Sequence, residues 1–596
     1  MTTWLDVSAV PLQGGYIAKQ CPVRIQNDIL RPVEPSPPSA EVLARMADGI
    51  AFEEAVLAEL ASFDRSGWVF IDPSWGREEA EAETLRAMAA GAELIAGGWL
   101  PADEAGRRTG KPDLLLRHGD GYVPVDVKNH LTLDVEEEQT ALVSPLEAPF
   151  FHQVEERAGL TRRKRKDDAL QLAHYWRMLE AAGYAASTPR AGIIGKEKVV
   201  AWYDLEEPLW QTPAKSDGKK RKTRTSLEVY DFEFCFRLDI AATAQQLMAG
   251  TAKELLVEPL WNSECPDCPW LPACRPVLEE GSGDPSLLPR ITYREWRLLR
   301  DHGIGDRAGV AKLSYRTAQA LIVGADPGDP DLDRVTAALG KASFLPEAIL
   351  NARAALGEAP VYRLPGAEAE VPRADIEIDV DMENTNEGVY LWGALVSDRA
   401  GSGLVAEGYR PFVTWEPLDP AVEERLFRSF WDWLSDLRRR AGERGLTVRA
   451  YCWYASAENT QIRRLVATDP TWGEEVKAFL ASGEWVDLEQ VFKESWTTGG
   501  SRSLKVIAPL AGHTWPVDDP GGGLSMLRHR DATSPDLEPE FREAARHWLL
   551  DYNRGDVEAT KRIREWLHAE GAGWPEVDTR EPRVPGDRSD HLQPRE

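Results

Sequence analysis

Three of the chain's six cysteines lie within ten residues, in the stretch SECPDCPWLPACRP at 263–276. Cys265, Cys268 and Cys274 have the spacing C-x2-C-x5-C, which lets their thiolates converge on one metal ion or cluster. Six cysteines in 596 residues, without a secretory signal pattern, do not predict a disulfide framework. We therefore expect these cysteines to bind metal. The metal site would be a fixed cross-link that constrains the rest of the fold.

A four-thiolate site needs one more cysteine, and three remain. Cys235 lies in the aromatic run YDFEFCFRL, which predicts a strand carrying a buried free thiol, and Cys452 lies in a later segment. Cys21, in AKQCPVR, is the expected fourth ligand. The site would then close a loop of about 240 residues and remove conformational entropy from the unfolded chain. The spacing leaves both a [4Fe–4S] cluster and a zinc ion open.

Proline- and glycine-rich seams divide the chain. At about 100–200 residues per domain, this length predicts several domains, and seams at 279–286 and 356–373 mark the boundaries. Within the helical part, WRLLRDHGIGDRAGVAKL resembles a helix-hairpin-helix unit or forms a plain connector. We expect four segments: an α/β domain over 1–275, a helical connector over 287–355, a second α/β domain over 374–568 and a polar, disordered tail over 569–596.

The first segment alternates helical and strand patterns. Apolar residues at helical spacing predict helices over 40–63 and 167–184. β-Rich runs predict strands at 121–130, 198–205 and 225–240. In the last α/β segment, 374–398 reads as a strand, a turn and a second strand.

Residues that could bind metal or take part in catalysis occur at several places in the first segment. Asp113, in GKPDLLLR, opens an apolar strand, and Asp126 and Lys128, in VPVDVKNH, lie two residues apart in another. Because side chains alternate along a strand, Asp126 and Lys128 project from the same face. Two carboxylates can hold Mg²⁺ or Mn²⁺, and a lysine can orient water or stabilise charge on a phosphate. Flanking helices add Glu53, Gln171 and Tyr175.

The order of these motifs resembles that of the RecB-like class of PD-(D/E)XK nucleases: Gly49…Glu53, Pro112-Asp113, Asp126-Val127-Lys128 and Gln171…Tyr175. The resemblance implies a restriction-endonuclease-like core and a metal-dependent nuclease whose metal ligands include Asp113 and Asp126. Members of this class often carry His directly before the helix glutamate, where this chain has Phe52. We expect a weaker metal affinity or an altered metal preference at this centre.

The same resemblance bears on the cysteines. RecB-like proteins with an iron–sulfur cluster have one cysteine before the nuclease core and three closely spaced cysteines after it, so that the cluster clasps the two ends. This layout favours a [4Fe–4S] cluster, with zinc as the alternative, on Cys21, Cys265, Cys268 and Cys274.

A second set of carboxylates lies in the last α/β segment. Asp381 and Glu383, in IEIDVDMEN, occupy alternate strand positions and face the same way, and Glu458 precedes an amphipathic helix. Tyr552 and Asp556 lie at i and i+4 on a helix. Four carboxylates and a tyrosine can hold two divalent ions and orient a water molecule.

This second set resembles the tyrosine subclass of the DEDD exonucleases, which have an RNase H-like fold. The resemblance implies that Asp381, Glu383, Glu458 and Asp556 bind metal, although the second motif normally offers Asp where this chain has Glu458. Lys505 is a further candidate, and for Asp487 we expect a capping role. The whole order of segments resembles a bacterial family of putative RecB-like nucleases with a C-terminal RNase H-like domain.

The net charge of −28 argues against general coating of nucleic acid, so binding must use local basic patches such as 157–166 and 215–224. We expect a cytoplasmic protein without membrane contact that acts on DNA or RNA, single-stranded or with free ends. Because the chain has no G-x-x-x-x-G-K-[ST] loop, unwinding would need a separate helicase. Two alternatives remain open: a nucleic-acid-binding scaffold with one or both centres inactive, and a zinc-stabilised regulatory protein.

Overall fold

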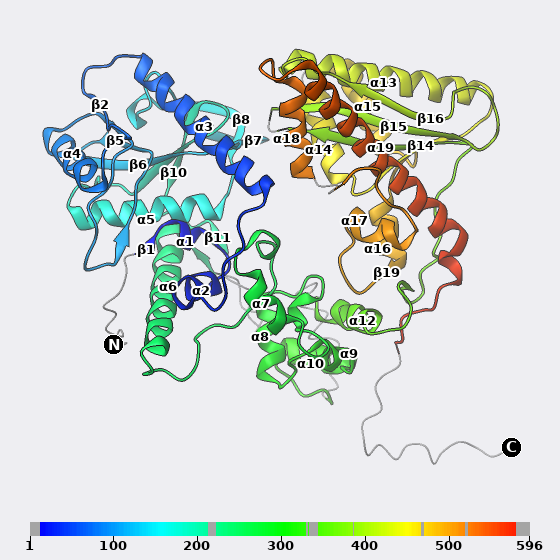
Figure 1. The fold of residues 1–596 in the computed structure, drawn as a ribbon, viewed down its shortest axis with the longest axis horizontal. Coiled ribbons are helices and arrows are strands. Elements are labelled where there is room, and N and C mark those ends of the chain that lie inside the picture. Colours follow the sequence, from blue (N-terminus) through cyan, green and yellow to red (C-terminus); the bar gives the residue numbers. More distant parts are fainter. Residues whose placement is uncertain are drawn as a thin grey trace. The chain divides into compact units, whose positions relative to one another are not determined.

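The computed structural model describes residues 12–211, 222–328, 332, 344–385, 387–466, 470–518 and 522–579. Over these residues the chain is a mixed α/β protein, and it divides into two compact units, Met1–Leu278 and Glu279–Glu596 (Figure 1). The expected α/β multidomain class is confirmed. Most of the basic run at 215–224 and residues 580–596 of the expected tail lie outside the described residues. None of the described helices is long and apolar enough to cross a membrane.

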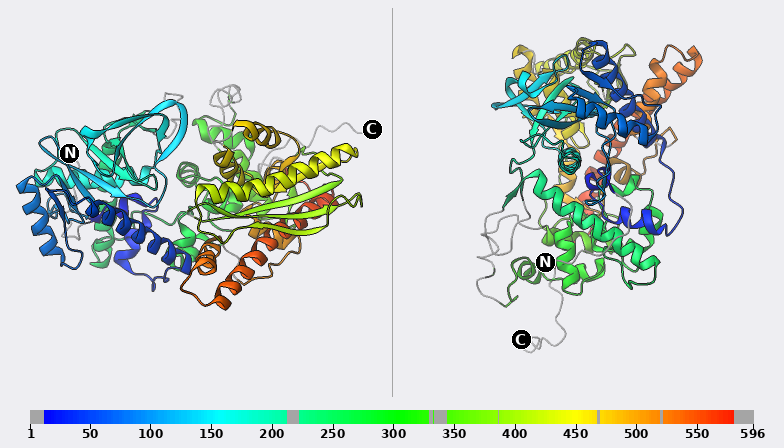
Figure 2. Two further views of the ribbon diagram at one scale, coloured as in Figure 1. Left: turned by 90° about the horizontal axis from the view of Figure 1, so that it is seen from above. Right: turned by 90° about the vertical axis from the view of Figure 1, so that its left-hand side faces the viewer.

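The first unit is built on an eight-stranded sheet with the order β2-β3-β5-β6-β9-β10-β7-β8. The strand β6 lies near the middle, antiparallel to β5 and parallel to β9. Figure 2 shows the long curved hairpin of β7 and β8 in cyan. The bounds of the strands are β2 Trp68–Phe70, β3 Leu94–Ala96, β5 Leu114–His118, β6 Gly121–Val127, β7 Leu133–Pro145, β8 Glu155–Arg162, β9 Arg190–Ile194 and β10 Val199–Asp204.

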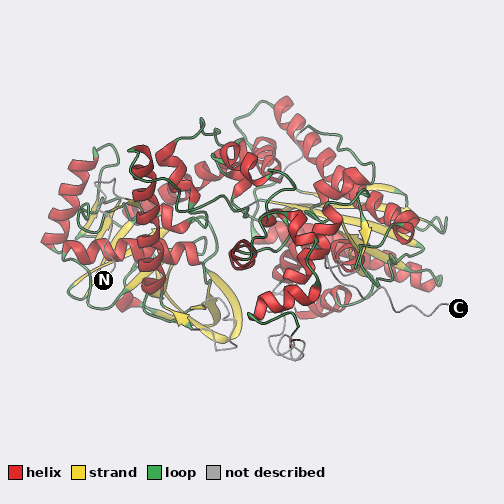
Figure 3. Ribbon diagram, turned by 90° about the horizontal axis from the view of Figure 1, so that it is seen from below, coloured by secondary structure: helices red, strands yellow, loops and turns green. Residues whose placement is uncertain are grey.

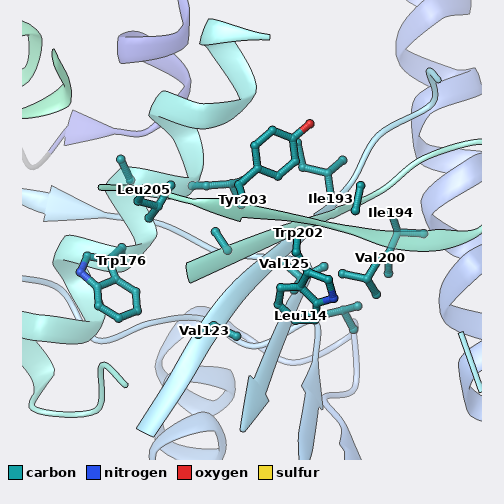
Figure 4. Close-up of a cluster of buried hydrophobic side chains, with 14 of the residues drawn as sticks. Leu114, Val123, Val125, Trp176, Ile193, Ile194, Val200, Trp202, Tyr203 and Leu205 are labelled. Atoms are coloured by element: carbon teal, nitrogen blue, oxygen red, sulfur yellow. The ribbon is translucent and has the colours of Figure 1, made fainter. Parts of the chain in front are cut away.

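Apolar residues of the sheet pack against the helix α5 to form the core of this unit. Val125 and Trp202 lie on one face of the sheet and Ile193 on the other, and these three residues and Trp176 of α5 are all buried (Figure 4). Helices predicted over 40–63 and 167–184 are present as α3 and α5. The helices of the unit are α1 Gly15–Ala18, α2 Val23–Leu30, α3 Ala40–Ser62, α4 Arg77–Ala90, α5 Lys166–Ala182, α6 Ser226–Met248 and α7 Leu271–Leu278.

The strand expected at 225–240 is wrong, because this segment forms the helix α6. The aromatic run favours a strand by propensity, but its buried residues Tyr230, Phe234 and Ala241 recur at helical spacing. A capping box starts the helix: the Thr225 side chain accepts from the Glu228 amide, and the Glu228 side chain accepts from the Thr225 amide. Cys235 therefore lies on a helix, as a free, half-buried thiol.

Short helices precede the sheet of the second unit. The helix α8 ends at a turn where Gly303 has a φ of +75°, and α9 follows, which gives the expected helix, glycine turn and helix. The described helices of this part are α8 Tyr293–Asp301, α9 Arg307–Ala311, α10 Tyr315–Val323 and α12 Leu345–Ala355.

The second unit contains a five-stranded sheet with the order β16-β15-β14-β17-β18. The predicted hairpin is present as β14 and β15, and β17 and β18 join the other side of β14 in parallel. The strands are β14 Ile376–Asn384, β15 Val389–Asp398, β16 Gly408–Val413, β17 Val448–Cys452 and β18 Trp485–Asp487. In both units helices flank the strands (Figure 3).

Two long helices lie on opposite faces of this sheet, α13 on one and α19 on the other (Figure 2). Ile376, Ile378 and Val380 of β14 face the apolar core with α13 residues such as Phe427 and Phe430. The alternate positions of β14 carry carboxylates that face α19. The helices are α13 Pro420–Glu443, α14 Ser456–Val466, α15 Pro470–Leu480, α16 Leu488–Ser495, α17 Leu504–Leu510, α18 Gly522–Thr533 and α19 Pro539–Glu570.

The chain also contains short strands outside the two main sheets. They pair as β1 with β4, β11 with β12 and β13 with β19. Their bounds are β1 Leu12–Gln13, β4 Arg108–Thr109, β11 Trp210–Gln211, β12 Thr223–Arg224, β13 Tyr362–Arg363 and β19 Trp496–Thr497.

Candidate metal centres

Three carboxylates of the second unit converge where β14 meets α19. Oxygen atoms of Asp381, Glu383 and Asp556 all lie within 4.8 Å of one another. In the described part of the chain, this is the one group of three or more His, Cys, Asp or Glu residues with that convergence. The strand supplies two of them from one face, and the helix supplies the third. Three carboxylate oxygens this close could supply part of the octahedral oxygen shell of a Mg²⁺ or Mn²⁺ ion.

Neighbouring polar groups orient each member of this acidic triad. Asn553 Nδ2 donates to Asp381 Oδ2 at 2.8 Å, and Ser525 Oγ donates to Glu383 Oε2 at 2.9 Å. Trp515 Nε1 donates to Asp556 Oδ1 at 2.7 Å, and Lys505 Nζ contacts the same oxygen. Groups that hold metal ligands in place in this way commonly set their orientation and basicity.

The triad concentrates negative charge in a buried place. Burial, and then the charges of Asp556 and Glu383, raise the pKa of Asp381 well above its usual range. Burial and Asp556 raise the pKa of Glu383 to about 8. Carboxylates that repel one another out of water are stabilised in their charged form by a divalent cation.

Tyr552 and Glu458 lie next to the triad. Tyr552 is one turn before Asp556 on α19 and is buried; burial, and then the charges of Glu383 and Asp556, raise its pKa, so the phenol keeps its proton. Glu458 lies in the first turn of α14 and is outside the converging group, but its charge acts on Asp381. Burial raises the pKa of Glu458 to about 8, and its Oε2 has no hydrogen-bond partner among the described residues.

The expected capping role of Asp487 is confirmed. Its carboxylate caps α16 by accepting from the amides of Glu489 and Gln490 at 3.0 and 3.2 Å. It also accepts from the amides of Tyr454 and Ala455 at 3.2 and 3.0 Å. Four amide donors occupy this carboxylate, so Asp487 holds the entry to α14 in place.

Sequence reasoning missed a buried ion cluster on the same strand. Arg564 of α19 is fully buried, and its guanidinium donates to Asp379 at 3.1 and 2.6 Å and contacts Glu377. Arg373 donates to Glu377 at 2.6 and 2.9 Å. The signal was present, because β14 has carboxylates at four alternate positions and Arg564 lies eight residues, about two helical turns, after Asp556.

The N-terminal centre brings together the residues expected there. Asp113 lies directly before β5, and its Oδ2 accepts from the Val127 amide at 2.7 Å. Asp126 of β6 is buried, and neither of its oxygens accepts a hydrogen bond of good geometry among the described residues. Lys128 Nζ lies 3.0 Å from Asp126 Oδ2 and donates to Gln171 Oε1 at 3.1 Å. The centre therefore contains its own cation.

Tyr175 and Glu53 complete this centre. Gln171 Nε2 donates to the Tyr175 hydroxyl at 2.9 Å, and Gln171 Oε1 accepts from Lys128. Gln171 therefore links Tyr175 to Lys128 by two hydrogen bonds. Burial, Asp126 and Glu53 raise the pKa of Asp113 well above its usual range. The side chain of Phe52 packs against the hydrophobic core and offers no ligand. These carboxylates do not reach the mutual 4.8 Å of the acidic triad in the described structure.

All four expected cysteine ligands line one small hollow. Cys21 precedes α2, Cys265 and Cys268 lie in and after a 3₁₀ turn, and Cys274 lies in α7. The rest of the lining is apolar: Val23, Pro259, Leu260, Leu271 and Leu278. Burial, and then the neighbouring cysteines, raise the pKa of Cys274 to about 11. Among the described residues, no three of these Sγ atoms lie within 4.8 Å of one another.

Hydrogen bonds fasten the two chain segments that carry these cysteines. The Glu264 carboxylate accepts from the amides of Gln20 and Cys21, both at 3.1 Å. Trp270 Nε1 donates to Asp28 Oδ1 at 2.7 Å, and Asn27 Nδ2 lies 3.8 Å from Cys274 Sγ. The segment before the sheet is thus tied to the segment after it, independently of any metal.

The basic run at 157–166 is largely paired. Arg163 lies 2.8 Å from Asp134, Arg165 lies 3.4 Å from Asp168, and Arg162 contacts Glu207. Lys164 is exposed. The run leads directly into α5, which carries Gln171 of the N-terminal centre.

Comparison with family models, curated proteins and solved structures found no match to this chain.

Proposed function

We propose that this protein is a divalent-metal-dependent nuclease that hydrolyses phosphodiester bonds of DNA or RNA, at single-stranded or free ends. It would combine a RecB-like PD-(D/E)XK domain, a four-cysteine clasp and a tyrosine-type DEDD domain with an RNase H-like fold. The observation that carries the proposal is the convergence of Asp381, Glu383 and Asp556 in a buried place next to Tyr552. Carboxylates, a neutral tyrosine and an adjacent lysine match the needs of phosphate hydrolysis.

Each residue of the C-terminal centre has a role that follows from its contacts. A divalent ion bound there would polarise the phosphate and lower the pKa of a water molecule. Asp381, Glu383 and Asp556 hold that ion, and Asn553 and Ser525 fix the orientation of the first two. Tyr552, protonated and buried beside Asp556, orients the attacking water by hydrogen bonding.

The residues of the N-terminal centre also suit metal-dependent hydrolysis of a phosphodiester, with a lower affinity for the metal ion. Asp113 and Asp126 would bind the ion, assisted by Glu53, while Lys128 interacts with the substrate phosphate. The Lys128 ammonium already lies 3.0 Å from Asp126, and Phe52 adds no ligand. We expect this centre to need Mn²⁺, which binds nitrogen and oxygen ligands more tightly than Mg²⁺ does, or to be the slower of the two.

The proposed occupant of the cysteine hollow is a [4Fe–4S] cluster, with a zinc ion as the alternative. Four thiolates can hold either, and the resemblance to RecB-like proteins that carry a cluster favours the first. A cube-shaped cluster takes thiolates at its corners and suits a hollow lined by apolar side chains. The cluster would reinforce the clasp that Glu264 and Trp270 already form.

Single variants test the nuclease proposal on end-labelled single- and double-stranded DNA and RNA with Mg²⁺ or Mn²⁺. Asp381→Asn should slow C-terminal cleavage about a thousandfold, because a lost ligand removes several kcal/mol of charge stabilisation. Asp551→Asn is the matched control: Asp551 lies on the same helix as Asp556 but pairs with Arg554 on the surface. Asp126→Asn should remove a second, separable activity. A double variant that digests as fast as the parent would show that a contaminant does the cutting.

A scaffold that binds nucleic acid without cutting it is the second candidate. It is favoured by the N-terminal centre, where Lys128 pairs with Asp126 and Phe52 replaces a ligand. Tight binding of an end-labelled oligonucleotide by the parent, with no cleavage under either metal, would establish it.

The cofactor is tested by anaerobic purification. We expect about four iron atoms per chain and broad absorption near 400 nm, both lost in Cys21→Ser. Cys235→Ser is the matched control, since Cys235 is free and lies on α6. If the protein contains stoichiometric zinc and no iron, the cofactor is a zinc ion and the cluster proposal is wrong.

A further inference from the structure

A lysine occupies part of the C-terminal acidic centre. Lys505, from the short helix α17, places Nζ against Asp556 Oδ1. Its ammonium also lies 4.1 Å from the ring centroid of Trp515 and 4.6 Å from that of Tyr552. Cation–π contacts with two rings and an ion pair hold the ammonium in one place.

This contact restricts what Asp556 can offer to metal. Its Oδ1 already accepts from Trp515 and Lys505, so the other oxygen is the one available to an ion. A two-ion site usually needs a carboxylate that bridges both ions. The fourth carboxylate, Glu458, stays outside the converging group, which leaves the second ion without a full set of ligands.

The charges of the groups in mutual contact are compatible with a single ion. Three converging carboxylates carry −3 and Lys505 carries +1, so one divalent ion balances these four groups. The side chain of Lys505 is 34% exposed, so it is not sealed inside the protein.

We propose that Lys505 takes the place of a second divalent ion, so that the C-terminal centre binds one ion and Lys505 is a catalytic residue that contacts the scissile phosphate. The inference rests on the proposed nuclease function. Water attacks phosphorus and loses a proton to solvent, and the bond to the leaving oxygen breaks with its electron pair on that oxygen. The leaving oxygen takes a proton from solvent, while Lys505 stays protonated and stabilises the developing negative charge.

The test counts Mn²⁺ by electron paramagnetic resonance titration. The full chain carries Asp113→Asn and Asp126→Asn, which leaves the N-terminal centre only Glu53 of its expected carboxylates. We expect one Mn²⁺ per chain, abolished by Asp381→Asn. Lys505→Met should bind Mn²⁺ at least about tenfold more tightly, since a competing cation is gone, yet cleave about a hundredfold more slowly. Lys505→Arg should keep part of the rate, and Lys561→Met, at a partly exposed α19 position near Glu565, should change neither quantity.

Each result separates this inference from the proposed function. Two Mn²⁺ ions per chain with Lys505 intact, or an unchanged Mn²⁺ affinity in Lys505→Met, overturns the inference and leaves the nuclease proposal standing. A parent that binds one Mn²⁺ and cuts no nucleic acid overturns the nuclease proposal and the catalytic role together, while the count of one ion stands. The count needs no variant at Lys505, so it holds even if that variant folds poorly.

Discussion

The carboxylates in the two halves of the strand β14 have partners of opposite charge. Glu377 and Asp379 face α19 and meet the guanidinium of Arg564, whereas Asp381 and Glu383, on the same face, meet a third carboxylate. Burial raises the pKa of Glu377, but Arg373 and Arg564 outweigh burial and lower it. Burial and Asp556 raise the pKa of Glu383 to about 8. The charges of Glu377 and Asp379 meet a cation of the chain, whereas Asp381 and Glu383 meet a further anion, for which we propose a divalent ion as the counter-charge.

This difference teaches how a single strand can carry both a structural and a functional set of charges. Arg564 and Asp556 belong to the same face of α19, two turns apart, so one helix supplies a cation to one half and a further anion to the other. Glu377, Asp379 and Glu383 are buried, and Asp381 is partly buried. The helix residue is a cation in one half and an anion in the other, although burial still raises the pKa of Asp379 beside Arg564.

The largest expected effect follows from removing the cation of the structural half. Arg564→Met would leave Glu377 and Asp379 buried without a partner, and we expect the free energy of unfolding to fall by ~3–5 kcal/mol. Arg554→Met, on the same helix but paired at the surface, should lose less than ~1 kcal/mol. Urea denaturation measures both, and equal losses would remove the distinction between the two pairs.

The pH dependence of stability sharpens the comparison. Glu383 and Glu458 have folded pKa values of about 8, against ~4.3 in an unfolded chain. Between these values the folded state binds more protons, so the stability of the metal-free protein should fall as pH rises from about 5 to about 8. Each group contributes a slope of at most ~1.4 kcal/mol per pH unit. Melting in chelator at several pH values checks this, and stability that rises over this range contradicts it.

Divalent metal should oppose this fall in stability with rising pH, and only through Asp381 and Glu383. At about one hundred times its dissociation constant, Mn²⁺ or Mg²⁺ should stabilise the protein by ~2.7 kcal/mol. The gain should be larger at pH 8 than at pH 6, because protons compete with the ion for the same oxygens. Asp381→Asn should abolish the gain from this centre in a chain that also carries Asp126→Asn. A gain of the same size in that double variant would place the ion elsewhere.

Much of the candidate site follows from spacing that the sequence displays. Asp381 and Glu383 share a face because a strand has a period of two, and Tyr552 and Asp556 share a face because a helix places i and i+4 together. That β14 and α19 would meet, and thereby join these pairs, is a matter of tertiary packing. The resemblance to a known arrangement supplied that step, and spacing alone did not.

Other parts could not be predicted for physical reasons. Trp515 and Ser525 contact the triad from outside any motif, so only the folded chain brings them there. The pairing of Arg564 with Asp379 joins positions 185 residues apart. The sequence predicts a strand where α6 lies because the aromatic and branched residues there have high strand propensity, although Thr225 and Glu228 have the signature of a helix start.

The most direct test of the central claim compares two glutamates on the same face of β14. In the metal-free protein at pH 8, Glu377→Gln should lower the free energy of unfolding by ~1.5–3 kcal/mol, because it weakens charge-assisted hydrogen bonds to Arg373 and Arg564. Glu383→Gln should raise it by ~1 kcal/mol, because it relieves repulsion with Asp556. The predicted result is that the two Glu→Gln substitutions change the free energy of unfolding with opposite signs. A loss of stability in both variants would contradict the account, since it would mean that Glu383 is already neutralised without metal.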